Sequence, residues 1–246
     1  MSPIFRAERI AEIDSTNEAL KHRAIAGAEE GLVLRADVQT AGRGRRGRHW
    51  VSEAGNLYMS VLLRPAKPPA MAATLGFVVA IALGRLLRAL VTVPVQHKWP
   101  NDVLVDGRKI SGILLESGGI VGGKVDWLVL GIGVNLHHHP EGGLYPTTDL
   151  VAAGGPSLTP DQAMDLLLGE FGPLYEVWLR SGFGALRADW LAHCSGLGEN
   201  VVARLEREEI VGRFEDIDPD GTLVLALADG SRRCLAAGDI FMPARS

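Results

Sequence analysis

The sequence predicts an α+β fold, in which strands and packed helices are followed by a small all-β barrel. Three observations support this fold class. Segments between residues 32 and 134 alternate apolar and polar side chains, as half-buried strands do. Residues 70–91 are apolar on nearly every side, which is typical of a central buried helix. Near residue 198 the pattern changes from helical to alternating, so we predict two domains, residues 1–197 and residues 198–246.

Composition limits the class of protein. The chain has 246 residues, 47% of them hydrophobic and 22% charged, which suits a medium domain with a small appendage. Its net charge of -4 argues against general nucleic-acid binding. Cys194 and Cys234 match no metal spacing, so we expect free thiols in a reducing compartment. Residues 1–13 lack the apolar core of a signal peptide, and arginines interrupt residues 70–90, so we expect a cytoplasmic protein without a membrane span.

The first predicted helix begins within residues 14–20. Ser15 and Glu18 have the spacing of a capping box. Ser15 and Thr16 either only cap this helix or also present its free N–H groups to a ligand. Residues 32–38 form a predicted strand, and Gln39 follows at its end. Gln39 is either a polar residue leaving the sheet or a partner for a ligand amide, because its side chain both donates and accepts.

Residues 42–50, Gly-Arg-Gly-Arg-Arg-Gly-Arg-His-Trp, form the most unusual segment. Glycine lets the backbone approach a ligand closely, and the guanidinium fork fits carboxylates and phosphates. Trp50 adds a flat apolar face on which an aromatic base can stack. Because no packed core holds so many arginines, the segment predicts a surface loop that closes over an anion.

Two further strands flank Pro100, after a strand over residues 56–64. Pro100 holds Trp99 extended and lacks an N–H, so residues 95–105 form two short strands around a rigid kink. The kink is either an ordinary turn or part of a polar site, and it carries Lys98, Asn101 and Asp102.

A tight turn at residues 106–108 predicts a hairpin that returns along residues 109–117. Lys109 opens the returning strand, where a lysine is normally solvated. Gly112 permits close approach of another group to this strand.

A second hairpin is expected through Gly118-Gly119 and Gly122-Gly123. Residues 127–134 are almost wholly apolar, which indicates a central strand, and it ends in Asn135. Residues 137–139 are three histidines, but adjacent side chains of an extended segment point to opposite faces, so we do not expect a metal site there.

Helices are predicted over residues 160–179, with a kink or split near Pro173, and over residues 185–194. The terminal barrel is predicted from four short alternating segments separated by turn signals. They are residues 201–205, 210–217, 223–227 and 232–235.

Together these segments resemble the biotin–protein ligase family, also called biotin–[acetyl-CoA-carboxylase] ligases. The resemblance covers the whole chain and depends on the order and spacing of its motifs. The matching motifs are Asp14-Ser15-Thr16-Asn17, Gln39, residues 42–48, Trp50, residues 98–102, residues 109–116 and residues 131–135. The fold that this implies is a mixed β-sheet with packed helices, like that of a class II synthetase, followed by a small barrel.

The resemblance implies a two-step reaction. Biotin and ATP, with magnesium, first give biotinyl-5'-adenylate and pyrophosphate. A specific lysine of a biotin carboxyl carrier protein or domain then attacks the activated carbonyl and releases AMP. The arginine loop suits this chemistry, because a carboxylate must approach a polyanion and cations screen the repulsion.

The resemblance also implies individual roles. The implied biotin site consists of Ser15, Thr16, Asn17, Gln39, Arg43, Gly44, Arg45, Lys109 and Gly112. Arg45 and Lys109 would be catalytic, stabilising charge at the acyl phosphate. The implied ATP site consists of Arg45, Arg46, Arg48, Trp50, Lys98, Asn101, Asp102 and Asn135, with adenine stacked on Trp50. Magnesium would come with ATP, near Asn101 and Asp102, without a fixed protein site.

Some members of this family carry an N-terminal helix-turn-helix domain and repress biotin genes. Here the ligase pattern begins at about residue 12, so we expect the short form without sequence-specific DNA binding. We expect the arginine loop to become ordered when ligand binds, because glycines and mutual repulsion oppose a fixed shape. A homodimer formed through an unpaired sheet edge remains open.

Three other interpretations compete with this one. A lipoate–protein ligase-like enzyme would use the same adenylate chemistry, but lipoate carries no ureido group to match Ser15, Thr16 and Gln39. An RNA-binding protein would use the arginine loop, but the net charge of -4 counts against it. A catalytically silent binding protein would not need Lys109.

Overall fold

In the computed structural model, which describes residues 4–142 and 145–241, the larger part of the chain is built on a seven-stranded mixed sheet. The strand order is β1-β2-β3-β7-β6-β5-β4, with β1 and β2 parallel and the other neighbours antiparallel. The strands are β1 (Arg6–Ile13), β2 (Leu32–Gln39), β3 (Leu57–Leu63), β4 (Val95–Lys98), β5 (Asp102–Val105), β6 (Arg108–Val121) and β7 (Lys124–Val134). This confirms the mixed sheet and the central position of the apolar strand at residues 127–134.

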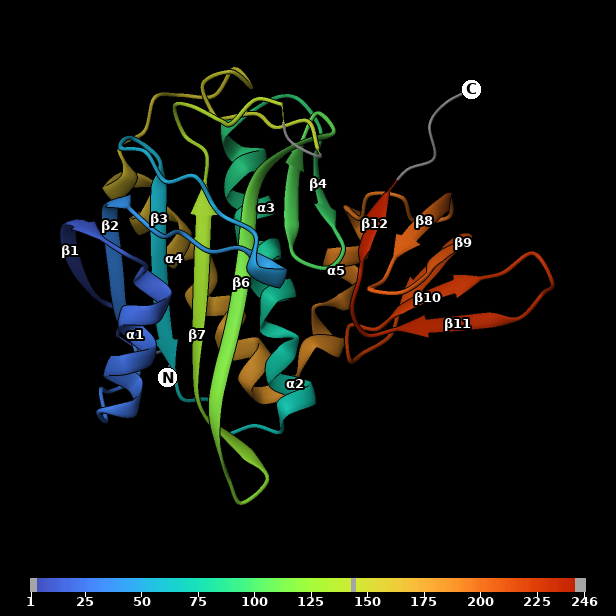
Figure 1. Ribbon diagram of the computed structural model, residues 1–246, viewed down its shortest axis with the longest axis horizontal. Helices are drawn as coiled ribbons and strands as arrows, with labels where there is room; N and C mark the ends of the chain where they lie inside the picture. The colour runs from blue at the N-terminus through green and yellow to red at the C-terminus, as the bar shows by residue number, and fades with distance from the viewer. Residues whose placement is uncertain (1–3, 143–144, 242–246) are drawn as a thin grey trace.

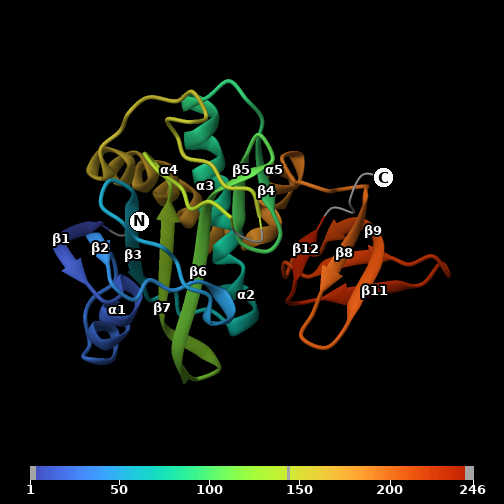
Figure 2. The same cartoon turned by 45° about the horizontal axis from the view of Figure 1, so that its top comes forward.

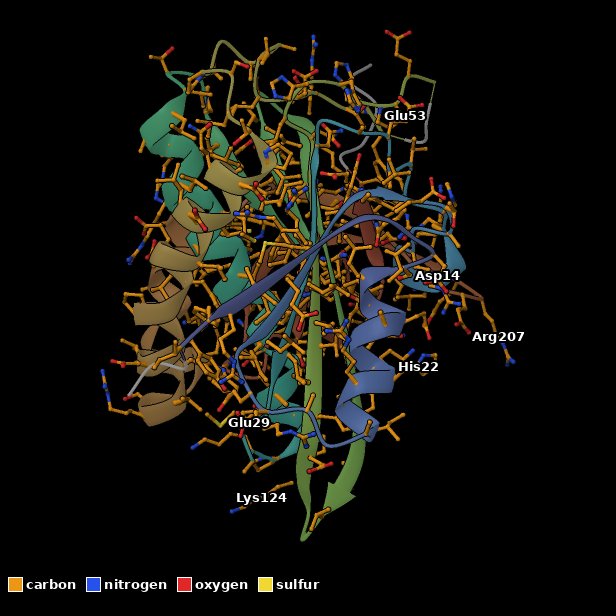
Figure 3. The ribbon with its side chains drawn as sticks, turned by 90° about the vertical axis from the view of Figure 1, so that its left-hand side faces the viewer. Asp14, His22, Glu29, Glu53, Lys124 and Arg207 are labelled. Atoms are coloured by element: carbon orange, nitrogen blue, oxygen red, sulfur yellow. The ribbon has the colours of Figure 1, made fainter. Side chains whose placement is uncertain are left out.

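Helices cover both faces of this sheet, as Figures 1 and 3 show. One face packs against α3 (Leu75–Leu90) and α4 (Pro160–Ser181), where Met59 and Val61 of β3 join the larger core. The other face packs against α1 (Thr16–Ile25) through Leu20 and Leu62. The alternation of β3 therefore sends its odd-numbered side chains to one core and Leu62 to the other.

The start of α1 differs from the predicted capping box. Ser15 caps the helix by accepting a hydrogen bond from Glu18 N at 3.5 Å. The reciprocal bond is absent, because Ser15 N donates to Asp14 Oδ1 at 2.6 Å. The Glu18 carboxylate is instead free to bind cations near the arginine loop. A complete capping box occurs at α4, between Thr159 and Gln162.

The predicted helix at residues 70–91 is in fact two, α2 (Pro69–Ala73) and α3, separated at Thr74. Thr74 Oγ1 accepts a hydrogen bond from Trp178 Nε1 of α4 at 2.8 Å. The segment Pro69–Leu90 is long and apolar enough to cross a membrane, but most of it is buried inside this fold. Helix α4 is continuous despite Pro173, so of the predicted kink or split the split is wrong.

The hairpins follow the sequence in part. Asp106 and Gly107 adopt φ of 51° and 71°, as a two-residue turn between antiparallel strands requires. The β6–β7 hairpin turns only at Gly122-Gly123, since β6 continues through Gly118-Gly119. Gly118 is required there because a Cβ would lie 2.3 Å from the Trp127 ring.

The C-terminal module is a five-stranded antiparallel sheet in the order β11-β10-β9-β8-β12. Its strands are β8 (Asn200–Arg204), β9 (Glu209–Ile217), β10 (Leu223–Ala226), β11 (Arg232–Leu235) and β12 (Asp239–Phe241). The predicted all-β module is confirmed, although within the described residues, which end at 241, β11 and β12 are its two edges and the barrel is not closed. Cys194 and Cys234 are both free thiols, as predicted.

The module packs beside the β4–β5 end of the large sheet (Figure 2). Trp99, at the cis Trp99-Pro100 bond, is 1% exposed, and its Nε1 donates to Gly221 O at 3.0 Å. Helix α5 (Arg187–Ala192) and the following linker complete this junction. His97 of β4 bonds through its backbone to His193 and Ser195 of that linker.

Candidate active site

A cavity of about 310 Å³ lies on the α1 side of the sheet, a volume that suits a small-molecule ligand. Its walls come from the start of α1, the segment after β2, the middle of β6 and β7, and the loop after β7. The predicted residues among its lining are Ser15, Thr16, Asn17, Gln39, Arg43, Gly44, Arg45, Arg48, Trp50, Asn101, Lys109, Gly112 and Asn135. Most of the predicted site is therefore brought together.

Three glycines form the floor of the cavity. Gly112 of β6 pairs with Gly133 of β7, and Gly131 lies two residues away on the same face. A Cβ at Gly112 or Gly133 would lie 2.9 Å or 2.6 Å from the Trp50 ring. The indole therefore packs directly against the backbone of two adjacent strands at these glycines. The space at Gly112, predicted for the biotin ring, is occupied here by Trp50.

The polar end of the cavity is a network around Gln39 and Thr16. Gln39 Oε1 accepts from Thr16 N at 2.9 Å and from Thr16 Oγ1 at 3.0 Å. Thr16 Oγ1 also lies 2.7 Å from Ser60 Oγ, and Gln39 Nε2 donates to Ser52 Oγ at 3.0 Å. Donors and acceptors thus alternate at this end, as a ligand with a cyclic urea or amide needs.

Asn17 extends this network across the sheet. Its Oδ1 accepts from Ser60 Oγ at 2.6 Å, and its Nδ2 donates to Glu116 Oε2 at 2.9 Å. A Cβ at Gly131 would lie 2.3 Å from Asn17 Oδ1, so only glycine leaves room for this side chain. Two hydrogen bonds and the close packing against Gly131 therefore fix the Asn17 side chain before any ligand binds.

A chain of ion pairs leads from this polar end to the arginine loop. Lys21 Nζ lies 2.9 Å from Glu116 and 2.8 Å from Glu18, and Arg43 Nη1 lies 2.6 Å from Glu18 Oε1. The hydrogen bond from Lys21 lowers the pKa of the Glu18 carboxyl below its usual value. Glu18 is therefore an anionic anchor for the beginning of the loop.

The arginine loop crosses the sheet from β2 toward the C-terminal module (Figure 1). It contains one 3-10 turn, η1 (Arg45–Gly47), in which Arg46 adopts a φ of 56°. Arg45 Nη1 donates to Asn101 Oδ1 at 3.1 Å, and Arg48 Nη2 donates to Asp239 Oδ1 at 3.2 Å. Burial lowers the pKa of Arg45, whereas Asp239 helps to raise that of Arg48 against the effect of burial.

Lys109 is not the solvated hairpin side chain that the sequence suggested. Its Nζ lies 2.6 Å from Asp102 Oδ1 and 5.5 Å from the Trp50 ring centroid, and its side chain is 20% exposed. Asp102 itself is 12% exposed at its side chain. The ion pair fixes the position of the Lys109 ammonium group where the Trp50 ring borders the cavity.

Arg46, Lys98 and Asp102 are the predicted site residues outside the cavity lining. Lys98 Nζ lies 3.8 Å from the centroid of the Tyr145 ring and 5.5 Å from that of Phe241. Burial lowers the pKa of Lys98. Its cation–π contacts join the sheet to the module, so Lys98 has a structural contact in addition to the nucleotide role predicted for it.

The side chains of Asn101 and Asn135 donate hydrogen bonds to backbone carbonyl oxygens and also line the cavity. Asn101 Nδ2 donates to Ile113 O at 2.7 Å, and Asn135 Nδ2 donates to Thr148 O at 3.0 Å.

The three histidines after Asn135 have separate partners. His137 and His138 contact the carbonyl oxygens of Leu158 and Glu53, and His139 contacts Asp149. Among residues 4–142 and 145–241, no group of metal-ligating side chains occurs.

Several residues of the site were missed from the sequence. Ser60 and Glu116 belong to predicted strands, but nothing in their periodicity indicates contact with α1. Tyr145 lies in a loop without regular structure, and Asp239 lies about 190 residues from the arginines that it contacts. For the apolar lining residues Met59, Ile113 and Ile132, the sequence pattern predicts a strand but does not indicate that they line a cavity.

Comparison with protein-family models identifies two matching regions. Residues 10–135 match the biotin/lipoate A/B protein ligase family, and residues 196–242 match the biotin protein ligase C terminal domain. The chain belongs to the biotin/lipoate A/B protein ligase family. The family region contains the end of β1 and all of β2 to β7, and the second match contains the C-terminal module.

Relatives in this family extend the similarity over nearly the whole chain. The biotin–[acetyl-CoA-carboxylase] ligase of Paracoccus denitrificans is 40% identical over 94% of this chain and 98% of its own length. The bifunctional ligase/repressor BirA of Bacillus subtilis is 31% identical over 92% of this chain and 70% of its own length.

Solved structures agree with this assignment. The biotin protein ligase of Aquifex aeolicus, in complex with biotin and ATP, has a TM-score of 0.80 at 26% identity and covers 96% of this chain and 97% of its own. The biotin protein ligase of Leishmania major, in complex with biotinyl-5-AMP, has a TM-score of 0.66 at 25% identity and covers 94% of this chain and 99% of its own.

Proposed function

We propose that this protein is an ATP-dependent biotin–[acetyl-CoA-carboxylase] ligase that attaches biotin to a specific lysine of a biotin carboxyl carrier protein or domain. The observation that carries the proposal is one cavity with a polar end at Thr16 and Gln39 and a cationic end at Arg45 and Lys109. The named relatives and the complexes with biotin, ATP and biotinyl-5-AMP support it.

In the first step, biotin carboxylate attacks the α-phosphate of ATP to give biotinyl-5'-adenylate and pyrophosphate. The polar network of Thr16, Gln39 and Asn17 would bind the ureido ring, so that the carboxylate reaches the cationic end. Ser15, Arg43 and Gly44 would complete the biotin site, and Gly112 would join it when the Trp50 ring leaves the space beside this glycine. Holding both substrates in line accounts for much of such an acceleration.

Arg45 and Lys109 would stabilise the charge that develops at the acyl phosphate. Both cations are partly desolvated, and charge stabilisation is strongest where water is excluded. The remaining ATP contacts are proposed for Arg46, Arg48, Asn101, Asp102 and Asn135, with adenine near Trp50. Lys98 would act at one remove, through Tyr145.

Magnesium would arrive with the nucleotide and neutralise phosphate charge. Asn101 and Asp102 offer oxygen atoms, which magnesium prefers. In this structure both are engaged by protein cations, Asn101 by Arg45 and Asp102 by Lys109. This supports a metal that is held mainly by phosphate oxygens, without a fixed protein site.

In the second step, the amine of the carrier lysine attacks the mixed anhydride and AMP leaves. The arginine loop lies over the cavity, so it would also shield the anhydride from water. We further propose that the enzyme acts in the cytoplasm without specific DNA contacts, and that residues 198–246 form a separate domain. The exposed edge strand β1 is the candidate surface for a homodimer.

The test is transfer of labelled biotin to a purified carrier domain with ATP and magnesium. We expect one label per carrier, release of AMP and pyrophosphate, and no labelling when the carrier lysine is replaced by arginine. Labelling with lipoate and not with biotin would keep the adenylate chemistry and contradict the proposed substrate.

A further inference from the structure

The C-terminal module contacts the arginine loop through one carboxylate. Asp239 Oδ1 lies 3.2 Å from Arg48 Nη2 and 3.8 Å from Arg45 Nη1, and its Oδ2 lies 3.6 Å from Arg46 Nη1. The Asp239 side chain is 14% exposed. Among the described residues, no other acidic side chain forms an ion pair with these three arginines.

The backbone holds this carboxylate in place. Asp239 begins β12 and pairs with Arg204 of β8. The preceding residue, Gly238, has a φ of 157°, and a Cβ there would lie 3.0 Å from Leu205 and 3.4 Å from the Trp99 ring. Arg45 Nη1 also lies 3.4 Å from Gly238 O. Asp239 is therefore presented by a strand that packs against the large sheet.

The charges around Asp239 do not balance. Three guanidinium groups face a single carboxylate, so positive charge remains for a more highly charged anion. Arginine binds phosphate oxygens in the same geometry in which it binds carboxylate oxygens. The other end of the loop is held separately, by the Arg43–Glu18 pair at 2.6 Å.

We propose that Asp239 is a positioning residue for the nucleotide step. Its carboxylate holds the loop through Arg45, Arg46 and Arg48, and the phosphates of ATP then replace this carboxylate on the three arginines. This inference rests on the proposed function and assigns the module a part in it. On these arginines, ATP binding replaces the singly charged carboxylate with the more highly charged phosphates. The loop thereby passes from the module to the nucleotide without losing its position over the cavity.

The variant Asp239→Asn removes the competing charge and keeps the size of the side chain. The KM for ATP should fall about three- to tenfold, because no carboxylate has to be displaced. The KM for biotin should change less than about twofold, since Thr16 and Gln39 lie at the other end of the cavity. Asp239→Glu, which restores the anion, should return the KM for ATP toward the wild-type value.

Trypsin gives a second readout that does not depend on activity. Of the four arginines in the loop, Arg45, Arg46 and Arg48 pair with Asp239, and their release from it should expose these three to cleavage. Without nucleotide, the loop of Asp239→Asn should be cut at least about five times faster than that of wild type. Addition of ATP should restore protection. The matched control is Glu208→Gln in the same module, because Glu208 pairs with Arg233 and not with the loop.

Equal cleavage of Asp239→Asn and wild type would overturn the inference, as would a higher KM for ATP in the variant. Failure of the proposed function would give a result different from equal cleavage and from a higher KM for ATP. It would appear as wild-type protein that forms no adenylate, while the trypsin experiment would still report whether Asp239 holds the loop.

Discussion

At the scale of single residues, absent side chains shape this site as much as present ones. Gly112, Gly131 and Gly133 remove Cβ atoms from one patch of the sheet, and Trp50 and Asn17 lie in the space. The sequence predicted an open position at Gly112, because glycine within a strand permits close approach. It could not predict that Trp50 would be the occupant, since that contact depends on the path of the arginine loop.

Gly131→Ala tests how far the polar network depends on this space. The added Cβ would lie 2.3 Å from Asn17 Oδ1, so Asn17 must move and lose its bonds to Ser60 and Glu116. We expect the KM for biotin to rise about tenfold and stability to fall by about 1–2 kcal/mol. Gly169→Ala in α4 is the control, because a Cβ there meets nothing within 4 Å. An unchanged KM for biotin in Gly131→Ala would show that Asn17 does not position this ligand.

Lys109→Gln separates catalysis from structural pairing. If Lys109 stabilises developing charge, adenylate formation should fall about 100-fold or more. Asp102→Asn breaks the same 2.6 Å ion pair but keeps the lysine charge. Because Asp102 is also a proposed ATP contact, both variants are compared at saturating ATP and magnesium, where the loss of rate in Asp102→Asn should stay below about tenfold. Stopped-flow measurement of adenylate formation, with thermal unfolding of both variants, gives the comparison. Equal losses of rate and of stability in the two variants would contradict the catalytic role assigned to Lys109.

At the scale of elements, strand prediction failed where burial is weak. β1, with the sequence Arg-Ala-Glu-Arg-Ile-Ala-Glu-Ile, lies at the edge of the sheet and exposes most of its side chains, so it lacks an apolar alternation. β12 has only three residues. By contrast, β3 and β7 were predicted closely, because their side chains are buried and apolar.

His97 of β4 makes the junction with the module sensitive to pH. Burial lowers its pKa from 6.5 to about 4, and its Nδ1 lies 3.1 Å from Trp190 O. Nε2 has no hydrogen-bond partner among the described residues. The fold therefore keeps His97 neutral, whereas the unfolded chain takes up a proton below about pH 6.5. Stability should fall as the pH decreases from about 6.5 toward 4.

Thermal or urea unfolding at pH 7 and pH 5 measures this effect. Wild type should lose about 2 kcal/mol from this group between the two values, and His97→Gln should lose correspondingly less. His22→Gln, on the exposed face of α1 (Figure 3), is the control and should retain the wild-type dependence. Identical pH dependence in His97→Gln and wild type would contradict the assignment.

At the scale of the whole molecule, the site is completed by segments that are distant in sequence. The mixed sheet, its helices and the terminal module followed from local pattern together with the family resemblance. The contact of Asp239 with the arginine loop did not, because no periodicity links residues so far apart. The same holds for Trp99, which looked like part of a polar turn and instead docks the module through Gly221. Charge and hydrogen bonding between the domains thus lay beyond sequence reasoning.

The most direct test of this account is biotin-dependent exchange of labelled pyrophosphate into ATP, with magnesium and with lipoate in a parallel reaction. The account predicts exchange with biotin and none with lipoate, because the Thr16–Gln39 end of the cavity presents paired donors and acceptors. Exchange with lipoate alone would contradict the assigned substrate. No exchange with either, from folded protein, would contradict the adenylate mechanism itself.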